Sequence, residues 1–237
     1  MPPALLARER SERPEFVQEN VHAKLSRIAE VLSAFTAGRS MRYPAGNVLF
    51  AQGEAATEIY VMVTGAVKLV RSEANTREIT VGICSRGSLV GVAPAMLDAP
   101  HPARAVTMVI SEIRPVAVAV FSERLSLERT LTDATVCILA GELIGQIRRA
   151  SRQTLNVRHR LTLLLIDLAQ SHGHHLPDGT IRIHLPLSQQ EIADLIVASR
   201  ESVNRAMADL HRAGWISKVD GWLTISKARS GSNSRPR

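Results

Sequence analysis

Four polar side chains lie close together between residues 200 and 205, and their chemistry suits the reading of DNA bases. Arginine can pair through two hydrogen bonds with guanine, asparagine can pair with adenine, and glutamate can accept from the amino group of cytosine. The segment carries these groups as Arg200, Glu201, Asn204 and Arg205. Near the N-terminus of a helix, the positive end of the helix dipole also favours an approaching phosphate. The spacing therefore predicts an edge that contacts double-stranded DNA.

Two short helices are expected to position this edge. Ser188 and Glu191 form a Ser-x-x-Glu pattern, in which each side chain satisfies the backbone N–H of the other residue, so a helix is predicted to begin at Gln189. Ser199 is predicted to cap the second helix. Apolar residues recur at helical spacing in both segments, at Ile192, Leu195, Ile196, Val203, Met207 and Leu210. The apolar faces are expected to be buried and the 200–205 edge to stay exposed.

The residues after the second helix predict a β-hairpin. Gly214 is a typical helix-ending residue, and two β-prone runs follow it on either side of Asp220-Gly221. An amphipathic helix with charges outside is most often an ordinary surface helix. The hairpin changes this interpretation, because two helices followed by a hairpin indicate a winged helix-turn-helix. Lys218 would then lie on the wing beside the phosphate backbone.

The segments 187–193 (LSQQEIA) and 199–205 (SRESVNR) resemble the DNA-binding domain of the cyclic-AMP receptor protein and fumarate-nitrate regulator (CRP/FNR) family of transcription regulators. The resemblance implies that Arg200, Glu201 and Arg205 read bases in the major groove. The full set of predicted DNA-contacting residues is Ser188, Gln190, Ser199, Arg200, Glu201, Asn204, Arg205 and Lys218. The family usually has glycine where this chain has Val197, so the turn is expected to differ slightly in geometry.

Residues 39–120 contain many short β-prone runs separated by glycines, a pattern typical of a sandwich or jelly-roll barrel. The motifs that begin at Tyr43 (YPAG), Gln52 (QGEA) and Thr64 (TGAV) resemble the β-roll sensor domain of the same family. We therefore expect an α+β protein with a β-roll (a double-stranded β-helix like that of cyclic-nucleotide-binding domains) before the winged helix-turn-helix.

The resemblance to the sensor domain raises the question of an effector. Nucleotide-binding members of the family use a Gly-Glu pair and a later Arg-Ser or Arg-Thr pair to hold the ribose and the cyclic phosphate. This chain keeps Gly91 and offers Arg104, but Val92 and Ala105 replace the carboxylate and the hydroxyl. Gly91 and Arg104 are the candidate effector-binding residues, and we expect an effector other than cyclic AMP. The alternatives are a regulator without an effector and with a vestigial pocket, or a true cyclic-nucleotide sensor.

No metal site or cofactor is predicted. The chain has two cysteines, Cys84 and Cys137, whereas an iron–sulfur member of the family needs several. Haem-binding members place cysteine and histidine near the segment 89–93, where this chain has small or apolar residues, so only a haem held differently stays open. Three histidines between His172 and His175 are expected in an exposed loop rather than around a metal.

An enzyme is the less favoured class. β-rolls of the cupin type host metal oxygenases, which need a His-x-His motif and a carboxylate on their strands. The only histidine between residues 39 and 120 is His101, which lies between two prolines. We therefore do not expect the protein to be an enzyme.

Residues 121–152 give the longest helical pattern in the sequence. Val136, Ala140, Leu143, Ile147 and Ala150 form a coiled-coil seam. A second apolar stripe runs through Leu131, Ala134, Ile138 and Gly141. Two stripes imply two partners, the β-roll and the same helix of a second subunit. We therefore expect a homodimer on a palindromic operator, because two recognition helices one DNA turn apart read an inverted repeat.

The expected organisation is an N-terminal arm and helix (1–38), the β-roll (39–120), the dimerisation helix (121–152), the DNA-binding domain (153–226) and a disordered basic tail (227–237). The net charge of +7 and the pI near 10.2 favour a polyanionic partner. No run of about 18 apolar residues is present, so we expect a cytoplasmic protein without a membrane partner. RNA polymerase is a further partner that the family resemblance implies.

Overall fold

The strands of the N-terminal half form two four-stranded sheets. The computed structural model describes residues 39–73 and 77–226. The first sheet has the order β1 (Met41–Tyr43), β8 (Ser111–Ala117), β3 (Glu58–Thr64) and β6 (Leu89–Val90). The second has the order β2 (Val48–Phe50), β7 (Arg104–Thr107), β4 (Ala66–Ser72) and β5 (Glu78–Ser85). All strand pairs are antiparallel, and the predicted β-roll is confirmed.

Alternating apolar residues from both sheets form one core between them. Met62, Val67 and Ile113 are fully buried there, beside Phe50 and Tyr60. Gly65 links β3 to β4 at a φ of 91°, and a Cβ atom on it would lie 2.2 Å from the Ser111 hydroxyl oxygen. Only glycine fits this turn, because the backbone conformation and the close approach of β8 both exclude a side chain.

The predicted long helix is two helices in the structure. A short helix, α3 (Val92–Met96), follows β6, and α4 (Val118–Leu127) and α5 (Arg129–Ser151) follow the last strand of the β-roll. Glu128 interrupts them in an extended conformation, and the Thr132 hydroxyl donates to the Leu125 carbonyl at 2.7 Å. The expectation of one continuous helix over 121–152 was therefore wrong. The break allows Phe121 of α4 and Leu131 of α5 to enter the same apolar core.

The two apolar stripes of α5 lie in different environments, as predicted. Leu131, Ala134 and Ile138 are buried against the β-roll, whereas Gly141 at the end of this stripe is exposed. The seam residues are all exposed, namely Val136, Ala140, Leu143, Ile147 and Ala150. By length and composition alone, Arg129–Thr154 could cross a membrane, with a mean hydropathy of 1.2. Its buried stripe, however, already has a protein partner in the β-roll.

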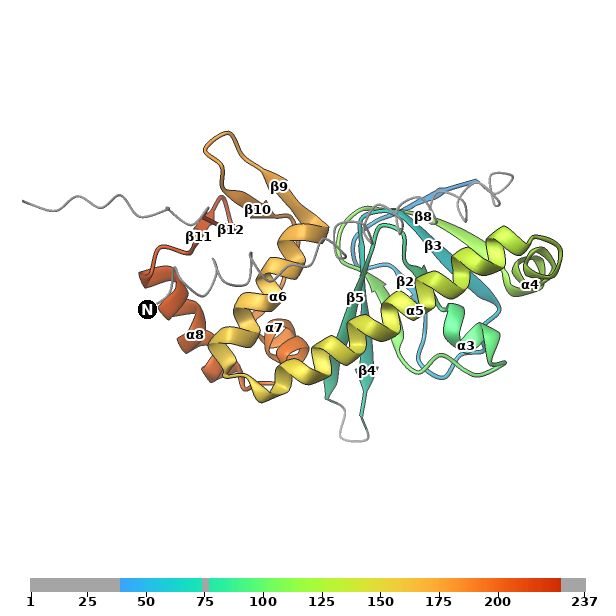
Figure 1. The fold of residues 1–237 in the computed structure, drawn as a ribbon, viewed down its shortest axis with the longest axis horizontal. Coiled ribbons are helices and arrows are strands. Elements are labelled where there is room, and N and C mark those ends of the chain that lie inside the picture. The colour runs from blue at the N-terminus through green and yellow to red at the C-terminus, as the bar shows by residue number, and fades with distance from the viewer. Residues whose placement is uncertain (1–38, 74–76, 227–237) are drawn as a thin grey trace, which may run out of the picture.

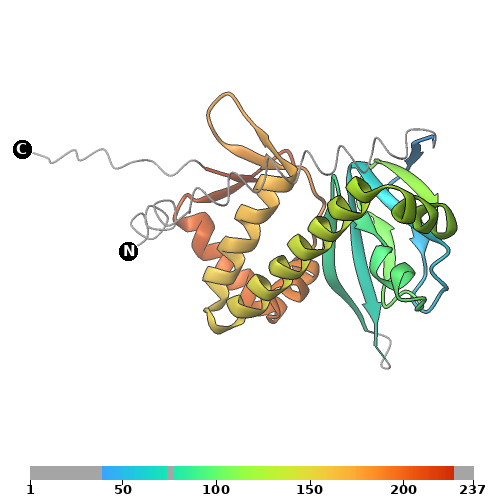
Figure 2. The same cartoon turned by 45° about the vertical axis from the view of Figure 1, so that its right-hand side comes forward.

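A short 3-10 turn, η1 (Arg152–Thr154), leads from α5 into the C-terminal half. This half contains α6 (Val157–His172), the strands β9 (Gly173–His175) and β10 (Ile181–Ile183), the helices α7 (Gln189–Ile196) and α8 (Arg200–Arg212), and the strands β11 (Ile216–Val219) and β12 (Trp222–Ile225). The four strands form one sheet in the order β11-β12-β10-β9. Figures 1 and 2 show this half at one end of α5 and the β-roll at the other.

The helices of the C-terminal half enclose a second apolar core. Leu161, Leu165 and Leu168 of α6 recur at helical spacing and are buried in it. The histidines between 172 and 175 were expected in a loop, but they end α6 and form β9, because β9 pairs with β10. The predicted N-terminal helix, the arm and the basic tail lie outside the described residues.

Candidate DNA-binding surface and sensor cavity

The first turn of α7 is fixed by the predicted reciprocal cap. The Ser188 hydroxyl accepts from the backbone N–H of Glu191 at 3.2 Å, and the Glu191 carboxylate accepts from the backbone N–H of Ser188 at 2.7 Å. At the start of α8, the Ser199 hydroxyl accepts from the backbone N–H of Ser202 at 3.2 Å. Both helices therefore begin at the residues that the sequence predicts, and α8 has a defined orientation relative to α7.

Val197 forms the turn between the two helices in a left-handed conformation, with φ 54° and ψ 61°. This is the conformation that glycine adopts in such a turn, and a β-branched residue reaches it only with strain. The Val197 side chain is 62% exposed, so core contacts do not compensate for the strain. The turn keeps the glycine geometry although the glycine is absent.

Replacing Val197 with glycine is expected to stabilise the protein by about 0.5–1 kcal/mol. The left-handed conformation costs a residue with a Cβ atom about 1–2 kcal/mol, of which the greater flexibility of glycine in the unfolded chain offsets part. The free energy of unfolding, measured by urea denaturation, checks this. Ala198→Gly is the control, because Ala198 does not have a positive φ, and it should destabilise the protein. Destabilisation by Val197→Gly would show that the turn is not strained.

The edge predicted to read DNA is exposed along its whole length. Val203, Ala206 and Leu210 turn the opposite face of α8 into the core. Arg200, Glu201, Asn204 and Arg205 are all exposed, and α7 lies between α8 and the β-roll (Figure 1). The Arg205 guanidinium donates to the Ser202 hydroxyl at 3.3 Å, which orients it along the helix. The structure thus brings the four side chains together on one accessible edge.

The charge of Glu201 is stabilised where a glutamate would accept from a base. Hydrogen bonds from its own backbone N–H and from the Ser199 hydroxyl lower the pKa of the Glu201 carboxyl, and the nearby Arg200 and Arg205 add to this. The carboxylate is therefore ionised at neutral pH and can act only as an acceptor. The Glu201 carboxylate lies on the same edge of α8 as Arg200 and Arg205, whose guanidinium groups can only donate hydrogen bonds.

The wing has the predicted hairpin geometry. β11 and β12 pair in antiparallel register around Asp220 and Gly221, whose φ angles are 51° and 83°. Two positive φ angles in succession are typical of the tight turn that an Asp-Gly pair forms. Asp220 accepts from Arg182 at 3.2 Å, and Lys218 is exposed on β11. Lys218 is therefore available for a phosphate contact.

The two predicted DNA-contacting residues at the start of α7 also have partners inside the protein. The Ser188 hydroxyl serves as the helix cap, and the Gln190 side-chain amide donates to Asp194 at 2.8 Å. Both residues are exposed, but Ser188 caps α7 and Gln190 lies in its first turn, away from the edge of α8. Their contact with DNA stays a prediction.

The β-roll contacts α7 through the edge strand β5 and its neighbour β4. Lys68 forms an ion pair with Glu191 at 2.7 Å. The backbone N–H of Thr80 donates to the Asp194 carboxylate at 3.1 Å, and Arg77 approaches the same carboxylate at 3.4 Å. An edge strand leaves backbone groups unpaired, and α7 covers this edge. The helix-turn-helix is thus held directly against the sensor domain.

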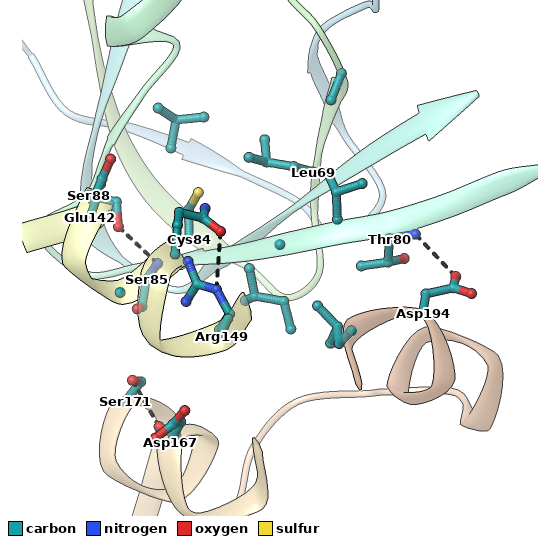
Figure 3. Close-up of a pocket in the computed structure, with 18 of the residues that line it drawn as sticks. Leu69, Thr80, Cys84, Ser85, Ser88, Glu142, Arg149, Asp167, Ser171 and Asp194 are labelled. Atoms are coloured by element: carbon teal, nitrogen blue, oxygen red, sulfur yellow. Dashed lines mark hydrogen bonds between the residues drawn. The ribbon is translucent and has the colours of Figure 1, made fainter. Parts of the chain in front are cut away.

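Between β5, α5 and the C-terminal half lies a cavity of about 850 Å³. Figure 3 shows Leu69 and Cys84 of the β-roll, Glu142 and Arg149 of α5, and Asp194 of α7 around it. The cavity therefore borders the sensor domain, the long helix and the helix-turn-helix at once.

The structure does not bring the two candidate effector residues together. Gly91 lines the cavity, whereas Arg104 is not one of the described residues that do so. The Arg104 guanidinium forms an ion pair with Glu78 at 2.9 Å on the surface of the second sheet. Val92, at the position of the carboxylate in nucleotide-binding members, is 2% exposed and belongs to the apolar core. The cavity therefore lacks both Arg104 and the carboxylate that nucleotide-binding members use to hold a cyclic nucleotide.

Sequence reasoning missed the residues that connect the cavity to the helix-turn-helix. Thr80 and Asp194 are 114 positions apart, and no spacing rule relates them. His101 also lines the cavity, although the sequence showed it only as an isolated histidine. In the sequence, Gly91 lies just before the short helix α3 and His101 follows ten residues later. This spacing was the one signal that the two residues line the same cavity.

Among the described residues, no group of three or more His, Cys, Asp or Glu side chains is arranged to hold a metal ion. Cys84 and Cys137 are free thiols, and both residues are partly buried. Burial of the sulfur, with a further effect of Glu142, raises the pKa of the Cys84 thiol to about 12. Cys84 is therefore a neutral thiol at physiological pH.

Comparison with known proteins agrees with both halves of the fold. The chain matches the cyclic nucleotide-binding domain family over residues 40–126 and the Crp-like helix-turn-helix domain family over residues 159–229. It is 32% identical over 183 residues to a CRP-like cAMP-activated global transcriptional regulator of Mycobacterium tuberculosis, covering 73% of this chain and 78% of that protein. It is 30% identical to a global nitrogen regulator of Synechococcus elongatus, covering 78% and 84%.

Solved structures share the fold. A c-di-GMP responsive global regulator of Xanthomonas campestris superposes with a TM-score of 0.66 at 24% identity, covering 84% of this chain and 99% of that one. A CRP/FNR-family transcriptional regulator of Thermus thermophilus superposes with a TM-score of 0.65 at 19% identity, covering 80% and 94%. With its sensor domain, long helix and helix-turn-helix in the family order, the chain belongs to the CRP/FNR family of transcription regulators.

Proposed function

We propose that the protein is a cytoplasmic, homodimeric regulator that binds a palindromic operator and responds to an effector other than cyclic AMP. RNA polymerase would be its further partner at promoters that it activates. One observation carries the proposal: Arg200, Glu201, Asn204 and Arg205 form an exposed edge on a helix whose opposite face is buried. Relatives of this chain are named as regulators, which makes an enzyme the less favoured alternative.

Selection of duplexes from a random library by the purified chain tests this function. We expect enrichment of an inverted repeat whose half-sites are about 10–10.5 base pairs apart, or a multiple of that, centre to centre. Two copies of α8 related by a two-fold axis impose that spacing. Enrichment of single half-sites, or of no sequence at all, would argue against a dimeric operator-binding protein.

The exposed seam of α5 supports the dimer. Val136, Leu143 and Ile147 are 57%, 62% and 60% exposed, although they repeat at the spacing of a coiled coil. Exposed apolar stripes of this kind mark interaction surfaces in soluble proteins. A second copy of α5 matches the stripe, because a seam that repeats in sevens packs best against an identical seam.

The cavity supports an effector over the alternative of a vestigial pocket. Gly91 lines it, and β5 forms one of its walls from Ile79 to Ser85. The same strand donates a hydrogen bond to Asp194 of α7. A ligand that shifts β5 would therefore act directly on the helix-turn-helix, and it must favour one arrangement of the two domains to have any effect.

Replacing Asp194 with alanine is expected to destabilise the folded chain by about 1–3 kcal/mol. The Asp194 side chain is 4% exposed, and its loss leaves the backbone N–H of Thr80 without an acceptor. Urea denaturation gives the change in the free energy of unfolding. Asp209→Ala is the matched control, because Asp209 pairs with Arg212 on the surface of α8 and should cost less than about 1 kcal/mol. Equal effects of the two substitutions would contradict a structural contact between β5 and α7.

A further inference from the structure

Arg160 of α6 contacts the turn between α7 and α8. Its Nη1 atom donates to the carbonyl of Ile196 at 2.7 Å and to the carbonyl of Val197 at 3.0 Å. Ile196 is the last residue of α7, and Val197 is the turn residue with the left-handed backbone. A partly buried arginine on one helix therefore binds the C-terminal end of another.

The two carbonyls depend on Arg160 for a partner. The last carbonyls of a helix have no partner within the helix. In α7, those of Ala193 and Asp194 accept from backbone N–H groups around the turn. Within the described part of the chain, no backbone N–H donates to the Ile196 or Val197 carbonyl. The last turn of α7 also has no basic residue of its own, so Arg160 supplies the positive charge that a helix C-terminus favours.

The two hydrogen bonds restrain the conformation of Val197. The Ile196 carbonyl belongs to the peptide plane before the Val197 Cα atom, and the Val197 carbonyl belongs to the plane after it. Because peptide groups are planar, the relative orientation of the two planes depends on φ and ψ of Val197. One nitrogen that binds both carbonyls therefore restrains φ and ψ together. Arg160 thus holds the turn in a conformation that valine adopts only with strain.

The apolar core holds the helices together without fixing this turn. Leu161 and Leu165 of α6 are fully buried in the core that also contains Ile192 of α7 and Val203 of α8. Apolar contacts of this kind are not directional. Val197 itself is 62% exposed, so the core does not determine its φ and ψ. The hydrogen bonds from α6 are directional, and they act on the turn itself.

The conformation of Val197 sets the direction of α8. Arg200 is the first residue of α8 and follows Val197 by three positions. A rotation about the Val197 backbone therefore turns the whole helix and the exposed edge that carries Arg200 and Arg205. Hydrogen bonds weaken steeply when donor and acceptor leave their alignment, and reading of a base by arginine needs two such bonds at once. The orientation of α8 consequently decides whether the guanidinium groups meet their bases.

We propose that Arg160 is a positioning residue for base reading: by fixing the turn it sets the orientation of α8 and hence the preference for the operator. The inference rests on the proposed function, in which α8 reads an operator. Arg160, Ile196 and Val197 also line the cavity. The contact therefore borders the space in which an effector is proposed to bind.

A single NMR signal reports the contact directly. Ile196 and Val197 form the one Ile-Val pair in the sequence, so the full chain labelled with carbonyl-13C isoleucine and 15N-valine gives one carbonyl–amide correlation. We expect Arg160→Met to shift this carbonyl resonance, because the carbonyl loses a charge-assisted hydrogen bond. Arg160→Lys should shift it less, since the ammonium group keeps the charge and can donate. An unchanged resonance in Arg160→Met would overturn the proposal.

The effect on base reading is measured by fluorescence anisotropy. The probes are a duplex selected from a random library and the same duplex with one base pair of each half-site replaced. We expect Arg160→Met to lower the preference for the selected duplex by about tenfold. Arg160→Lys should lower it less, in step with its smaller shift of the Ile196 resonance. A preference that survives in Arg160→Met, or an equal loss on all duplexes, would overturn the proposal. If Arg160→Met proves unfolded in urea titrations, a preference in Arg160→Lys that does not follow the resonance would overturn it instead.

Arg152→Met is the matched control. Arg152 is also a partly buried arginine that lines the cavity, but its guanidinium pairs with Asp167 of α6 and not with the turn. Its substitution should leave the Ile196 resonance and the preference for the selected duplex unchanged. A loss of preference equal to that of Arg160→Met would show that any disturbance of this cavity wall has the same effect, and the positioning role would be wrong.

The same measurements distinguish this inference from the proposed function. A wild-type chain that prefers the selected duplex, together with an equal preference in Arg160→Met, would overturn the inference and leave the proposed function intact. A wild-type chain without any preference among duplexes would contradict the proposed function, whatever the Ile196 resonance shows.

Discussion

Alanine at Arg200 or Arg205 is expected to remove about 1–3 kcal/mol of base discrimination each, which is roughly a 5- to 150-fold loss of preference for the selected operator over other DNA. Both guanidinium groups lie on the exposed edge of α8, where they can reach guanine O6 and N7. Fluorescence anisotropy on the selected duplex and on duplexes with single substitutions measures the change. The loss should be concentrated at one base pair of each half-site.

Two controls show whether this effect belongs to base reading. Arg212 is on the same helix, but it pairs with Asp209 in the last turn, so Arg212→Ala should leave the preference for the operator unchanged. Lys218 on the wing is expected to contact phosphate. Lys218→Ala should therefore weaken all duplexes alike and reduce the slope of log affinity against log salt by about 1. A uniform loss from the Arg200 and Arg205 substitutions would assign them to phosphate contact instead.

Replacing Leu143 and Ile147 together with glutamate is expected to convert the dimer into a monomer. In a coiled coil, the two seams would then place four carboxylates against each other without partners, and burial of unpaired charges is strongly unfavourable. A monomer binds one half-site only, so the affinity for the full operator should fall by about 100-fold or more. Analytical ultracentrifugation gives the mass, which is 25.8 kDa for one chain.

The matched control places glutamates on exposed leucines that lie off the seam. Leu97 and Leu127 are 76% and 73% exposed, at the ends of α3 and α4. The double substitution adds the same charge, and it should leave both the mass and the operator affinity unchanged. Dimer formation by the Leu143 and Ile147 variant would show that α5 is not the interface.

The sequence could predict the elements whose signals are local. The Ser188–Glu191 pattern identified the first residue of α7, and Asp220-Gly221 identified the wing, because caps and tight turns depend on a few neighbouring residues. The stripe of Leu131, Ala134 and Ile138 also identified the face of α5 that covers the β-roll. Helical periodicity alone reveals this face.

The sequence could not predict contacts that join distant segments. Lys68 and Glu191 are 123 positions apart, and each is an ordinary charged residue on a polar face of its own element. No proline or glycine marks the break at Glu128 in the sequence. The break follows from the packing of α4 and α5 against one core. Arg104 was a candidate effector-binding residue because arginine can pair with a phosphate. The alternation of side chains along the strand, however, directs Arg104 towards Glu78.

The most direct test of the central claim, that the exposed edge of α8 enters the major groove in two copies, combines protein and DNA substitutions. Each guanine of the selected operator is replaced in turn by 7-deazaguanine, which lacks the N7 acceptor. We predict that the wild-type chain loses affinity at one symmetry-related pair of guanines, and that Arg205→Ala or Arg200→Ala loses no more there. If the losses from the arginine and the guanine substitutions add in full at every position, these side chains do not read the bases of the groove.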